Sequence, residues 1–268
     1  MSDHSRITYE VEDSIAVITL NEPAKLNPLS AQQTAEMLAA LEQVRQDRAV
    51  RALILTGAGK AFCAGANLSD IAVHEGSGKT LGQATAETME VLSNPLILAL
   101  REMPVPVLTA LNGAAVGGGA GLALAADIVI AARSAYLYLP SMPRLGLVPD
   151  LGATWFMHEQ LGRSRALALT LLGDRIPAEQ AVQWGLIWAC VDDEALRMEA
   201  IKLARRLAAL PSHAALEARR AYEAARGNDL TAQLAHEAVR QRELIDLDSF
   251  AEGVRAFAER RDPVFSGR

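Results

Sequence analysis

The sequence is short of cysteine, of aromatic side chains and of long apolar runs. Its 268 residues include 2 cysteines, and Phe, Trp and Tyr together make up 4% of the chain. Neither Cys63 nor Cys190 has a cysteine or histidine at a short, zinc-type spacing, which argues for reduced thiols and against a metal site. No stretch reaches the ~18 uninterrupted apolar residues of a membrane span, and residues 1–10 lack the apolar core of a secretory signal. We therefore expect a cytoplasmic protein with no membrane or metal partner.

Positive charge is also in short supply. The chain carries 26 Lys and Arg against 32 Asp and Glu, a formal net charge of -6. The basic residues are scattered among acidic ones and form no stripe that could follow a row of phosphates. This distribution predicts that the protein has no nucleic-acid partner.

What is present is an alternation of apolar strand-like and helix-like segments. Residues 15–20 and 52–56 read as strands, and residues 30–44 between them have helical spacing. Ser30 followed by Gln33 has the form of a capping box, which marks the start of that helix. Further strand-like runs at 105–111, 127–132 and 186–191 alternate with helix-like stretches. This rhythm predicts an α/β fold with mainly parallel strands.

The pattern changes from about Asp193 onward. The remaining segments are rich in Ala, Arg and Glu, are broken at Pro211 and Gly227, and contain no strand candidate. Helices of this kind more often pack or oligomerise than catalyse. We therefore divide the chain into a core that carries the site, residues 1–205, and a helical oligomerisation region, residues 206–268. Within the core, the glycine-rich segment Glu75–Gly82 has the composition expected of a lid.

Two turns rich in small residues carry the main functional signal. Gly57–Leu68 and Asn112–Gly121 each follow a strand, so both lie at the carboxyl edge of a parallel sheet, where they can converge. Two backbone N–H groups aimed at one carbonyl oxygen form an oxyanion hole, in which one donor lowers the barrier by about 2.7–4 kcal/mol. The second turn fits a dinucleotide motif poorly, because Leu122 stands where the third glycine is needed. Glycines that only allow close helix packing remain an alternative.

The two turns, followed at this spacing by Gly146–Gly152, resemble the enoyl-CoA hydratase/isomerase (crotonase) superfamily. The resemblance covers nearly the whole chain, down to Glu252, Gly253 and Phe257. It implies a crotonase-like spiral of ββα/βαβ units and a C-terminal α-helical trimerisation region, hence a homotrimer or a dimer of trimers. It also implies an acyl-coenzyme A substrate, with no cofactor beyond the coenzyme A of that substrate.

The resemblance assigns roles residue by residue. The oxyanion donors are expected to be the N–H groups of Ala66 and Gly118. The residues expected near coenzyme A or the acyl group are Lys25, Leu26, Ala64, Leu68, Met142 and Phe257, the last of them from a neighbouring subunit. Family members that add water to a double bond share two glutamates. The resemblance places Gly121 and Met142 at the matching positions of this chain. Hydratase chemistry is therefore not expected.

Asp150 is the carboxylate that remains in the Gly146–Gly152 segment. A single carboxylate can take an α-proton from a thioester and return it at another carbon, provided that the enolate oxygen is stabilised. Spacing alone favours the alternative that Asp150 caps the following helix. Its position resembles that of the acid in dienoyl-CoA isomerases and in the 1,2-epoxyphenylacetyl-CoA isomerases of phenylacetate catabolism. We therefore expect an isomerase that moves a double bond or opens a ring epoxide.

Other readings of the site stay open. One is an enoyl-CoA hydratase-like lyase, and another is a non-catalytic member that binds acyl-CoA without exchanging protons. A third is a haloaroyl-CoA dehalogenase, since in those relatives the position of Asp150 holds a nucleophilic aspartate.

Overall fold

A six-stranded sheet forms the centre of the molecule. In the computed structural model, which describes residues 5–67 and 78–266, the strand order is β1-β2-β3-β5-β7-β10. The strands are β1 (Ile7–Glu12), β2 (Ile15–Leu20), β3 (Ala52–Gly57), β5 (Val107–Leu111), β7 (Ile128–Ala132) and β10 (Ala189–Val191). Only the β1–β2 pair is antiparallel among these strands. The prediction of an α/β fold with mainly parallel strands is confirmed.

A second, smaller sheet lies beyond the carboxyl ends of the first. Its strands are β4 (Ala61–Cys63), β6 (Ala114–Val116), β8 (Tyr136–Tyr138) and β9 (Arg175–Pro177), in the order β4-β6-β8-β9. Each of β3, β5 and β7 is followed directly by a strand of this small sheet, so a strand–strand–helix unit repeats along the chain. Three-residue strands are too short to show a period in the sequence, and the pattern reading missed this sheet.

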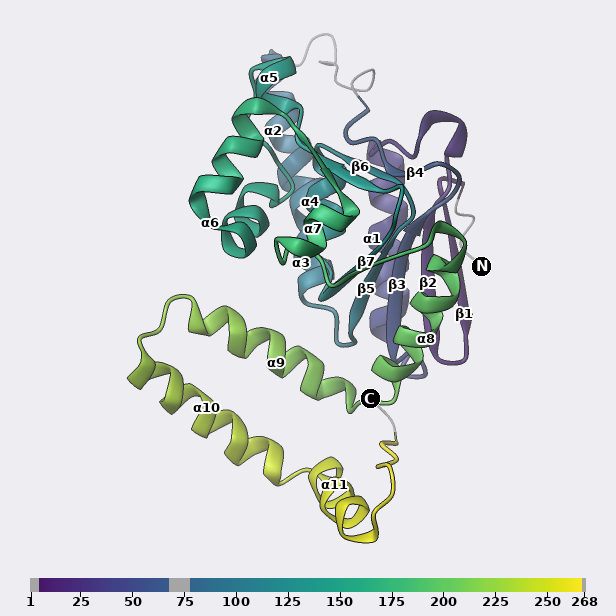
Figure 1. Cartoon of the computed structure of the whole chain (residues 1–268), viewed down its shortest axis with the longest axis vertical. Helices are drawn as coiled ribbons and strands as arrows, with labels where there is room; N and C mark the ends of the chain where they lie inside the picture. The colour runs from purple at the N-terminus through teal and green to yellow at the C-terminus, as the bar shows by residue number, and fades with distance from the viewer. Residues whose placement is uncertain (1–4, 68–77, 267–268) are drawn as a thin grey trace.

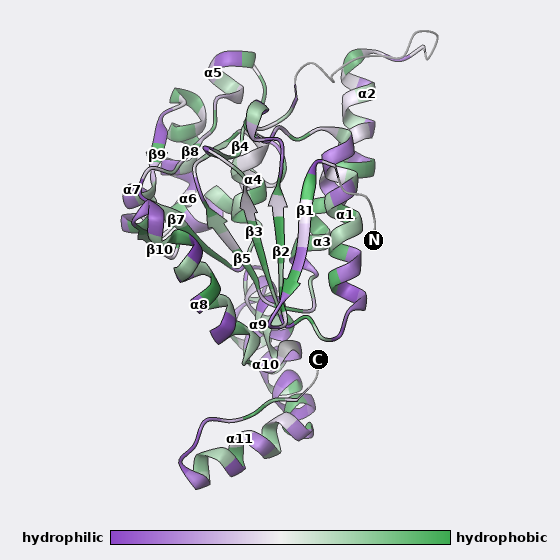
Figure 2. Cartoon of the chain, turned by 90° about the vertical axis from the view of Figure 1, so that its right-hand side faces the viewer, coloured by the Kyte–Doolittle hydropathy of each residue, from purple (hydrophilic) through white to green (hydrophobic). Residues whose placement is uncertain are grey.

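Helices cover both faces of the large sheet. Helix α1 (Ala31–Gln46) packs on β1, β2 and α3 (Asn94–Arg101), whereas α8 (Leu196–Ala208) packs on β3, β5 and β7. Figure 2 shows these two groups on opposite sides of the strands. Helix α1 begins as predicted, because the Ser30 hydroxyl accepts the Gln33 N–H (3.1 Å). The Gln33 side chain donates to the Arg6 carbonyl (3.4 Å), so only half of the expected capping box forms.

Further helices complete the core. They are η1 (Pro23–Lys25), α2 (Leu81–Thr88), η3 (Met89–Ser93), α4 (Gly118–Leu124), α5 (Ser141–Leu145), α6 (Ala153–Leu172), α7 (Ala178–Gln183) and η4 (Asp193–Ala195). Two of them, α4 and α7, contact strands of the small sheet. Of the predicted lid Glu75–Gly82, residues 75–77 lie outside the described part of the chain. Its last two residues begin α2, which Thr80 and Gln83 cap reciprocally.

Three helices extend away from the core as a C-terminal arm, residues 212–259 (Figure 1). They are α9 (Ser212–Ala225), α10 (Leu230–Ile245) and α11 (Asp248–Glu259). The prediction of a helical C-terminal region is confirmed. Helix α8 continues to Ala208, past the predicted boundary between residues 205 and 206, and the two-part division and the role in trimerisation stay predictions.

A buried arginine fastens the arm to the core. Arg219 of α9 donates from Nε and Nη2 to the two carboxylate oxygens of Asp127 (2.7 and 2.6 Å). Its Nη1 also donates to the carbonyls of Arg101 and Met103 (2.6 and 2.8 Å). This planar, bidentate geometry suits arginine and not lysine.

Within the described part of the chain, no helix combines the length and the apolar character needed to cross a membrane. Residues 5–67 and 78–266 also hold no group of three or more His, Cys, Asp or Glu side chains arranged as metal ligands.

Candidate active site

The two small-residue turns meet where the large sheet ends. Strands β4 and β6, which follow β3 and β5, pair in parallel, with Ala61 opposite Ala114. A β-carbon on Gly65 would stand 3.7 Å from the backbone nitrogen of Gly118 and 2.6 Å from the carbonyl oxygen of Val116. The structure thus brings the first turn into backbone contact with the start of α4, as predicted.

The N–H of Ala66 points away from the backbone hydrogen bonds that join its turn to Leu29. Ala66 forms a parallel bridge with Leu29, in which Leu29 N–H donates to Gly65 O (2.8 Å) and Asn67 N–H donates to Leu29 O (3.2 Å). Because N–H groups along an extended chain alternate in direction, the N–H between these two bonds faces the other side. Ala66 is exposed, so this donor is accessible to a ligand.

The second candidate donor lies at the start of α4. Gly118 is the first residue of that helix, and Gly117 precedes it with a φ of 54°. The N–H groups of a first helical turn have no partner within the helix. They also lie at the positive end of its dipole, which favours a developing negative charge. The N–H of Gly118 is thus suited to an oxyanion.

Asp150 lies beside this donor. Its Oδ1 is 3.2 Å from the point where a β-carbon on Gly118 would stand. Burial raises the pKa of this carboxyl above its ordinary value, and a hydrogen bond from its own backbone N–H opposes the rise. Among the described residues no charged neighbour contributes to that shift, so burial is its cause and the carboxyl is a desolvated group beside the oxyanion site.

The alternative that Asp150 caps α6 is wrong. The N-cap residue of α6 is Gly152, and no side chain caps that helix. Asp150 contributes only its backbone carbonyl, which accepts the N–H of Ala153 (2.9 Å). The side chain is therefore free of the structural task that competed with a catalytic one.

The two positions that resemble hydratase glutamates hold no carboxylate, and one has no space for a side chain. At Gly121, the carbonyl of Leu151 stands closer to an added β-carbon than any real β-carbon allows. Leu151 has a φ of 47°, so the Asp150 loop reaches α4 through a strained residue. The second position, Met142, lies half-buried in α5 and presents a thioether.

Three of the residues expected near coenzyme A lie next to the first turn. Lys25 ends η1, and Leu26 follows it with a φ of 62°. The carbonyl of Leu26 accepts the N–H of Ala64 (2.9 Å). The structure therefore brings Lys25, Leu26 and Ala64 together. Leu68 lies outside the described residues.

Phe257 lies far from the other site residues of its own chain. It is 88% exposed on α11. Figure 1 shows α11 at the end of the molecule opposite to β4, β6 and α4. A contribution of Phe257 to the site thus requires a second copy of the chain.

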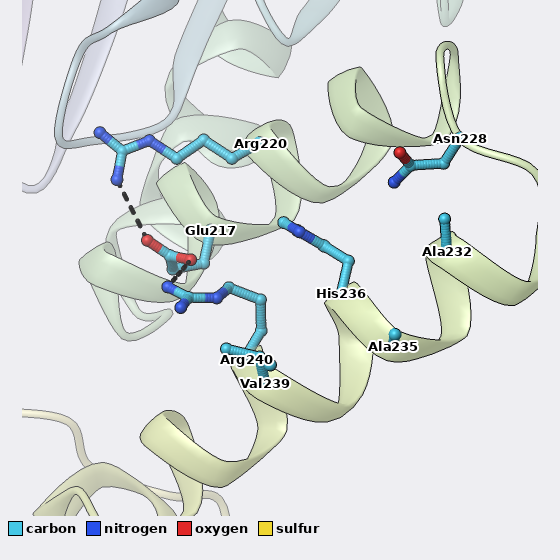
Figure 3. Close-up of a pocket in the computed structure, with 8 residues that line it drawn as sticks. All are labelled: Glu217, Arg220, Asn228, Ala232, Ala235, His236, Val239 and Arg240. Carbon is cyan, nitrogen blue, oxygen red and sulfur yellow. Dashed lines mark hydrogen bonds and ion pairs between the residues drawn. The ribbon is translucent and has the colours of Figure 1, made fainter.

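A groove between α9 and α10 is separate from this site. Figure 3 shows Glu217 at its wall, bridging Arg220 (3.2 Å) and Arg240 (3.3 Å). The Nε2 of His236, which also lines the groove, is buried without a hydrogen-bond partner among the described residues. None of the predicted site residues lines this groove.

Sequence reasoning missed one buried polar residue beside the first turn. Asn27 is fully buried and adopts a φ of 55°. Its amide nitrogen donates to the carbonyls of Ala58 and Ala61 (2.9 and 2.8 Å). The signal in the sequence was an asparagine directly before a proline, which is typical of a turn held by its own side chain.

Comparison with known proteins agrees with this geometry. The family model described as enoyl-CoA hydratase/isomerase matches residues 10–268. A Rhodobacter capsulatus protein named "probable enoyl-CoA hydratase" is 44% identical over 268 residues, which are 100% of both chains. The 1,2-epoxyphenylacetyl-CoA isomerase of Escherichia coli is 43% identical over 263 residues, 98% of each chain.

The fold has close counterparts among solved structures. The crystal structure of an enoyl-CoA hydratase from Bacillus anthracis matches with a TM-score of 0.89 and 32% identity, over 97% of this chain and 99% of that chain. The family model, the full-length relatives and the solved structure all belong to this one family and fold. The chain therefore belongs to the enoyl-CoA hydratase/isomerase family and has the crotonase fold.

Proposed function

We propose that this protein is an acyl-CoA isomerase in which Asp150 transfers a proton while the N–H groups of Ala66 and Gly118 stabilise the thioester enolate. The observation that carries the proposal is the position of the Asp150 carboxylate, 3.2 Å from the β-carbon position of Gly118. A base on the residue next to an oxyanion donor in space can act on the α-carbon while the donor binds the carbonyl oxygen of the same thioester.

The proposed reaction is a two-step proton transfer. Asp150 takes a proton from the α-carbon of a 3-enoyl-CoA, and the electron pair of that C–H bond moves to the thioester oxygen. The Ala66 and Gly118 N–H groups stabilise the resulting dienolate. Asp150 then returns the proton to the γ-carbon, the α–β double bond forms, and the oxygen loses its charge. No redox or metal partner enters this sequence of steps.

Hydration is the competing activity, and the names of the relatives support both. The Rhodobacter capsulatus relative is named a hydratase and the Escherichia coli relative an isomerase. The contact between Leu151 and Gly121 supports the isomerase, because it leaves no space for a water-activating carboxylate at position 121. In a hydration reaction, Asp150 alone would have to activate the water molecule. The hydratases of this family share a second carboxylate for that task.

A ring-epoxide substrate is a second candidate, supported by 43% identity to the 1,2-epoxyphenylacetyl-CoA isomerase over 98% of the chain. Removal of the α-proton by Asp150 would give the same enolate. The carbon–oxygen bond at the β-carbon would then break, its electron pair would move to the epoxide oxygen, and that oxygen would take a proton. The catalytic groups are thus common to both substrates, and the acyl pocket selects between them.

The experiment that tests the proposal is proton exchange in heavy water. The protein is incubated with a 3-enoyl-CoA, and α-deuteration is followed by mass spectrometry while double-bond migration is followed by absorbance. The isomerase is expected to incorporate deuterium and to form the conjugated 2-enoyl-CoA. Binding without exchange above the buffer rate would instead indicate a non-catalytic acyl-CoA binding member, and chloride release from a chloroaroyl-CoA would indicate the dehalogenase.

We also propose that the working unit is a homotrimer or a dimer of trimers. The support is the position of α11, which carries Phe257 and lies at the end of the molecule opposite to β4, β6 and α4, so that Phe257 can reach a site only on another copy (Figure 1). Light scattering after size-exclusion chromatography measures the mass directly. A mass of one chain at micromolar concentration would contradict this part of the proposal.

A further inference from the structure

Two asparagines, the fully buried Asn27 and the half-buried Asn112, donate to one backbone oxygen between the oxyanion turns. The Nδ2 of Asn27 donates to the carbonyl of Ala61 (2.8 Å), and the Nδ2 of Asn112 donates to the same carbonyl (3.2 Å). Asn27 comes from the loop after β2, and Asn112 follows β5. Ala61 begins β4, which leads to Ala66. One carbonyl therefore joins three segments that are far apart in the sequence.

Asn27 fixes the loop that carries Lys25 and Leu26. Its Oδ1 accepts the N–H of Glu22 (2.8 Å), at the start of that loop. Its second amide hydrogen goes to the carbonyl of Ala58 (2.9 Å). The φ of 55° is a conformation that asparagine tolerates better than most residues. With these bonds, the amide of Asn27 clamps the loop onto the turn between β3 and β4.

Asn112 fixes the second turn to the same segment between β3 and β4. Its Oδ1 accepts the N–H of Gly57 (3.0 Å), and its Nδ2 also donates to the carbonyl of Gly59 (3.0 Å). The following residue, Gly113, packs so closely on the carbonyl of Lys60 that any side chain would overlap it. The segment that leads to Gly118 is therefore bonded to the segment that leads to Ala66.

We infer that Asn27 and Asn112 are positioning residues that set the separation of the Ala66 and Gly118 N–H groups through the Ala61 carbonyl. Asn27 additionally holds the Lys25–Leu26 segment in register with that pair. The inference rests on the proposed function, because it assigns the asparagines a role in the same oxyanion site. Misplacing a catalytic group by about 1 Å can cost ~10²-fold in rate, so a rigid link between the two donors has a direct kinetic consequence.

The test uses aspartate at each position. Asn112→Asp keeps the shape and the acceptor for Gly57 N–H, but it places a carboxylate oxygen against the carbonyls of Gly59 and Ala61. Asn27→Asp does the same at Ala58 and Ala61. Leu53→Ala is the control for lost stability, since Leu53 is fully buried near the amino end of β3, away from the turns. Asn112→Ser is a neutral second variant should the aspartate variant not fold.

The readout is the ultraviolet spectrum of a bound 2,4-dienoyl-CoA, together with kcat and KM for the isomerisation. A conjugated thioester absorbs at longer wavelength when two N–H groups polarise its carbonyl. We expect wild type and Leu53→Ala to show the same red shift. Asn112→Asp and Asn112→Ser should lose most of it, with kcat lower by about tenfold or more and KM changed by less than about threefold. Asn27→Asp should also raise KM by about tenfold or more.

Two results would overturn the inference, and they distinguish its own failure from the failure of the proposed function. If the position 27 and 112 variants keep the full red shift and kcat while losing thermal stability as Leu53→Ala does, the asparagines are structural only. If the dienoyl-CoA binds wild type without a red shift, the oxyanion site of the proposed function fails, and the role of the asparagines fails with it.

Discussion

The backbone carbonyl of Leu151 occupies the space in which a side chain on Gly121 would begin. Leu151 holds a φ of 47°, a conformation that costs a leucine of order 1–3 kcal/mol and that the surrounding structure must enforce. Through this contact the loop of Asp150 rests directly on the helix that begins at Gly118. The proton acceptor and one oxyanion donor are therefore parts of one packed unit.

Enlarging Gly121 should damage both stability and catalysis. In Gly121→Ala the added methyl group displaces Leu151 and with it Asp150, so we expect the free energy of unfolding to fall by about 1–3 kcal/mol and kcat to fall with it. Urea denaturation and the exchange assay measure the two effects. Gly82→Ala, in the exposed helix α2 with nothing nearer than 3.9 Å to the added carbon, is the matched control and should be neutral or stabilising. An unchanged Gly121→Ala variant would contradict the packed unit.

The raised pKa of Asp150 predicts two linked pH effects. The base must be ionised, so kcat/KM should fall on acidification at a pH above the ~3.9 of an ordinary aspartate. The folded protein also binds this proton more tightly than the unfolded chain does, so stability from this group is present at low pH and is lost as pH rises through the folded-state pKa. Asp150→Asn should therefore unfold at higher urea than wild type at pH 7.

Urea denaturation of both proteins at pH 7 and pH 4 checks this sign. The difference in unfolding free energy should shrink toward pH 4, where the wild-type carboxyl regains its proton. Equal unfolding free energies of the two proteins at pH 7 would show that the carboxylate is not desolvated. A fall of kcat/KM only at the pKa of an exposed aspartate would show the same.

The Ala66 N–H can be removed without changing a side chain. Replacing Ala66 by its α-hydroxy acid turns this N–H into an ester oxygen and leaves both bonds of the Leu29 bridge in place. We expect kcat to fall by about 10²–10³, the typical effect of one oxyanion donor, with little loss of stability. The same replacement at Ala64 is the comparison, since that N–H donates to Leu26 O (2.9 Å) and should affect stability and binding. A wild-type kcat in the protein with the ester at position 66 would show that the Ala66 N–H is not an oxyanion donor.

The arm depends on Arg219, whose side chain is 3% exposed in its pair with Asp127. Arg219→Ala leaves the carbonyls of Arg101 and Met103 without this donor, while Asp127 keeps the Val107 N–H, and we expect a loss of about 1–3 kcal/mol in unfolding free energy. Arg219→Lys should recover only part, because an ammonium group cannot form the bidentate pair. Arg205→Ala, which removes an exposed ion pair with Asp13, should cost less than about 1 kcal/mol. Similar losses for Arg219→Ala and Arg205→Ala would contradict the anchoring role.

The sequence predicted the elements whose signals are long or chemically distinctive. Strands β2, β3, β5 and β7 of the large sheet are mainly apolar runs of five or six residues, α1 has a capping serine, and the two turns have their small residues. The small sheet was missed because its strands have three residues each. Strand β1 was missed because it is an edge strand with a mixed polar sequence.

The sequence singled out the backbone donors and the carboxylate of the candidate site, but it gave no indication of the contacts that hold them together. That Leu151 fills the space over Gly121, and that Asn27 and Asn112 share the Ala61 carbonyl, are contacts between segments distant in the sequence. No local pattern encodes them, because they arise only when the loops pack. The same holds for Arg219, which reads as one arginine among many in a polar helix and is buried by its contact with Asp127.

The central claim is that Asp150 moves the α-proton of a bound acyl-CoA, and deuterium incorporation by wild type and Asp150→Asn tests it most directly. Both proteins are loaded with the same 3-enoyl-CoA in heavy water, and binding is measured in parallel by calorimetry. We predict that both bind with similar affinity, that wild type incorporates deuterium at the γ-carbon and, by return of the dienolate to substrate, at the α-carbon, and that Asp150→Asn incorporates none above the buffer rate. Exchange by the bound Asp150→Asn protein at the wild-type rate would contradict the account.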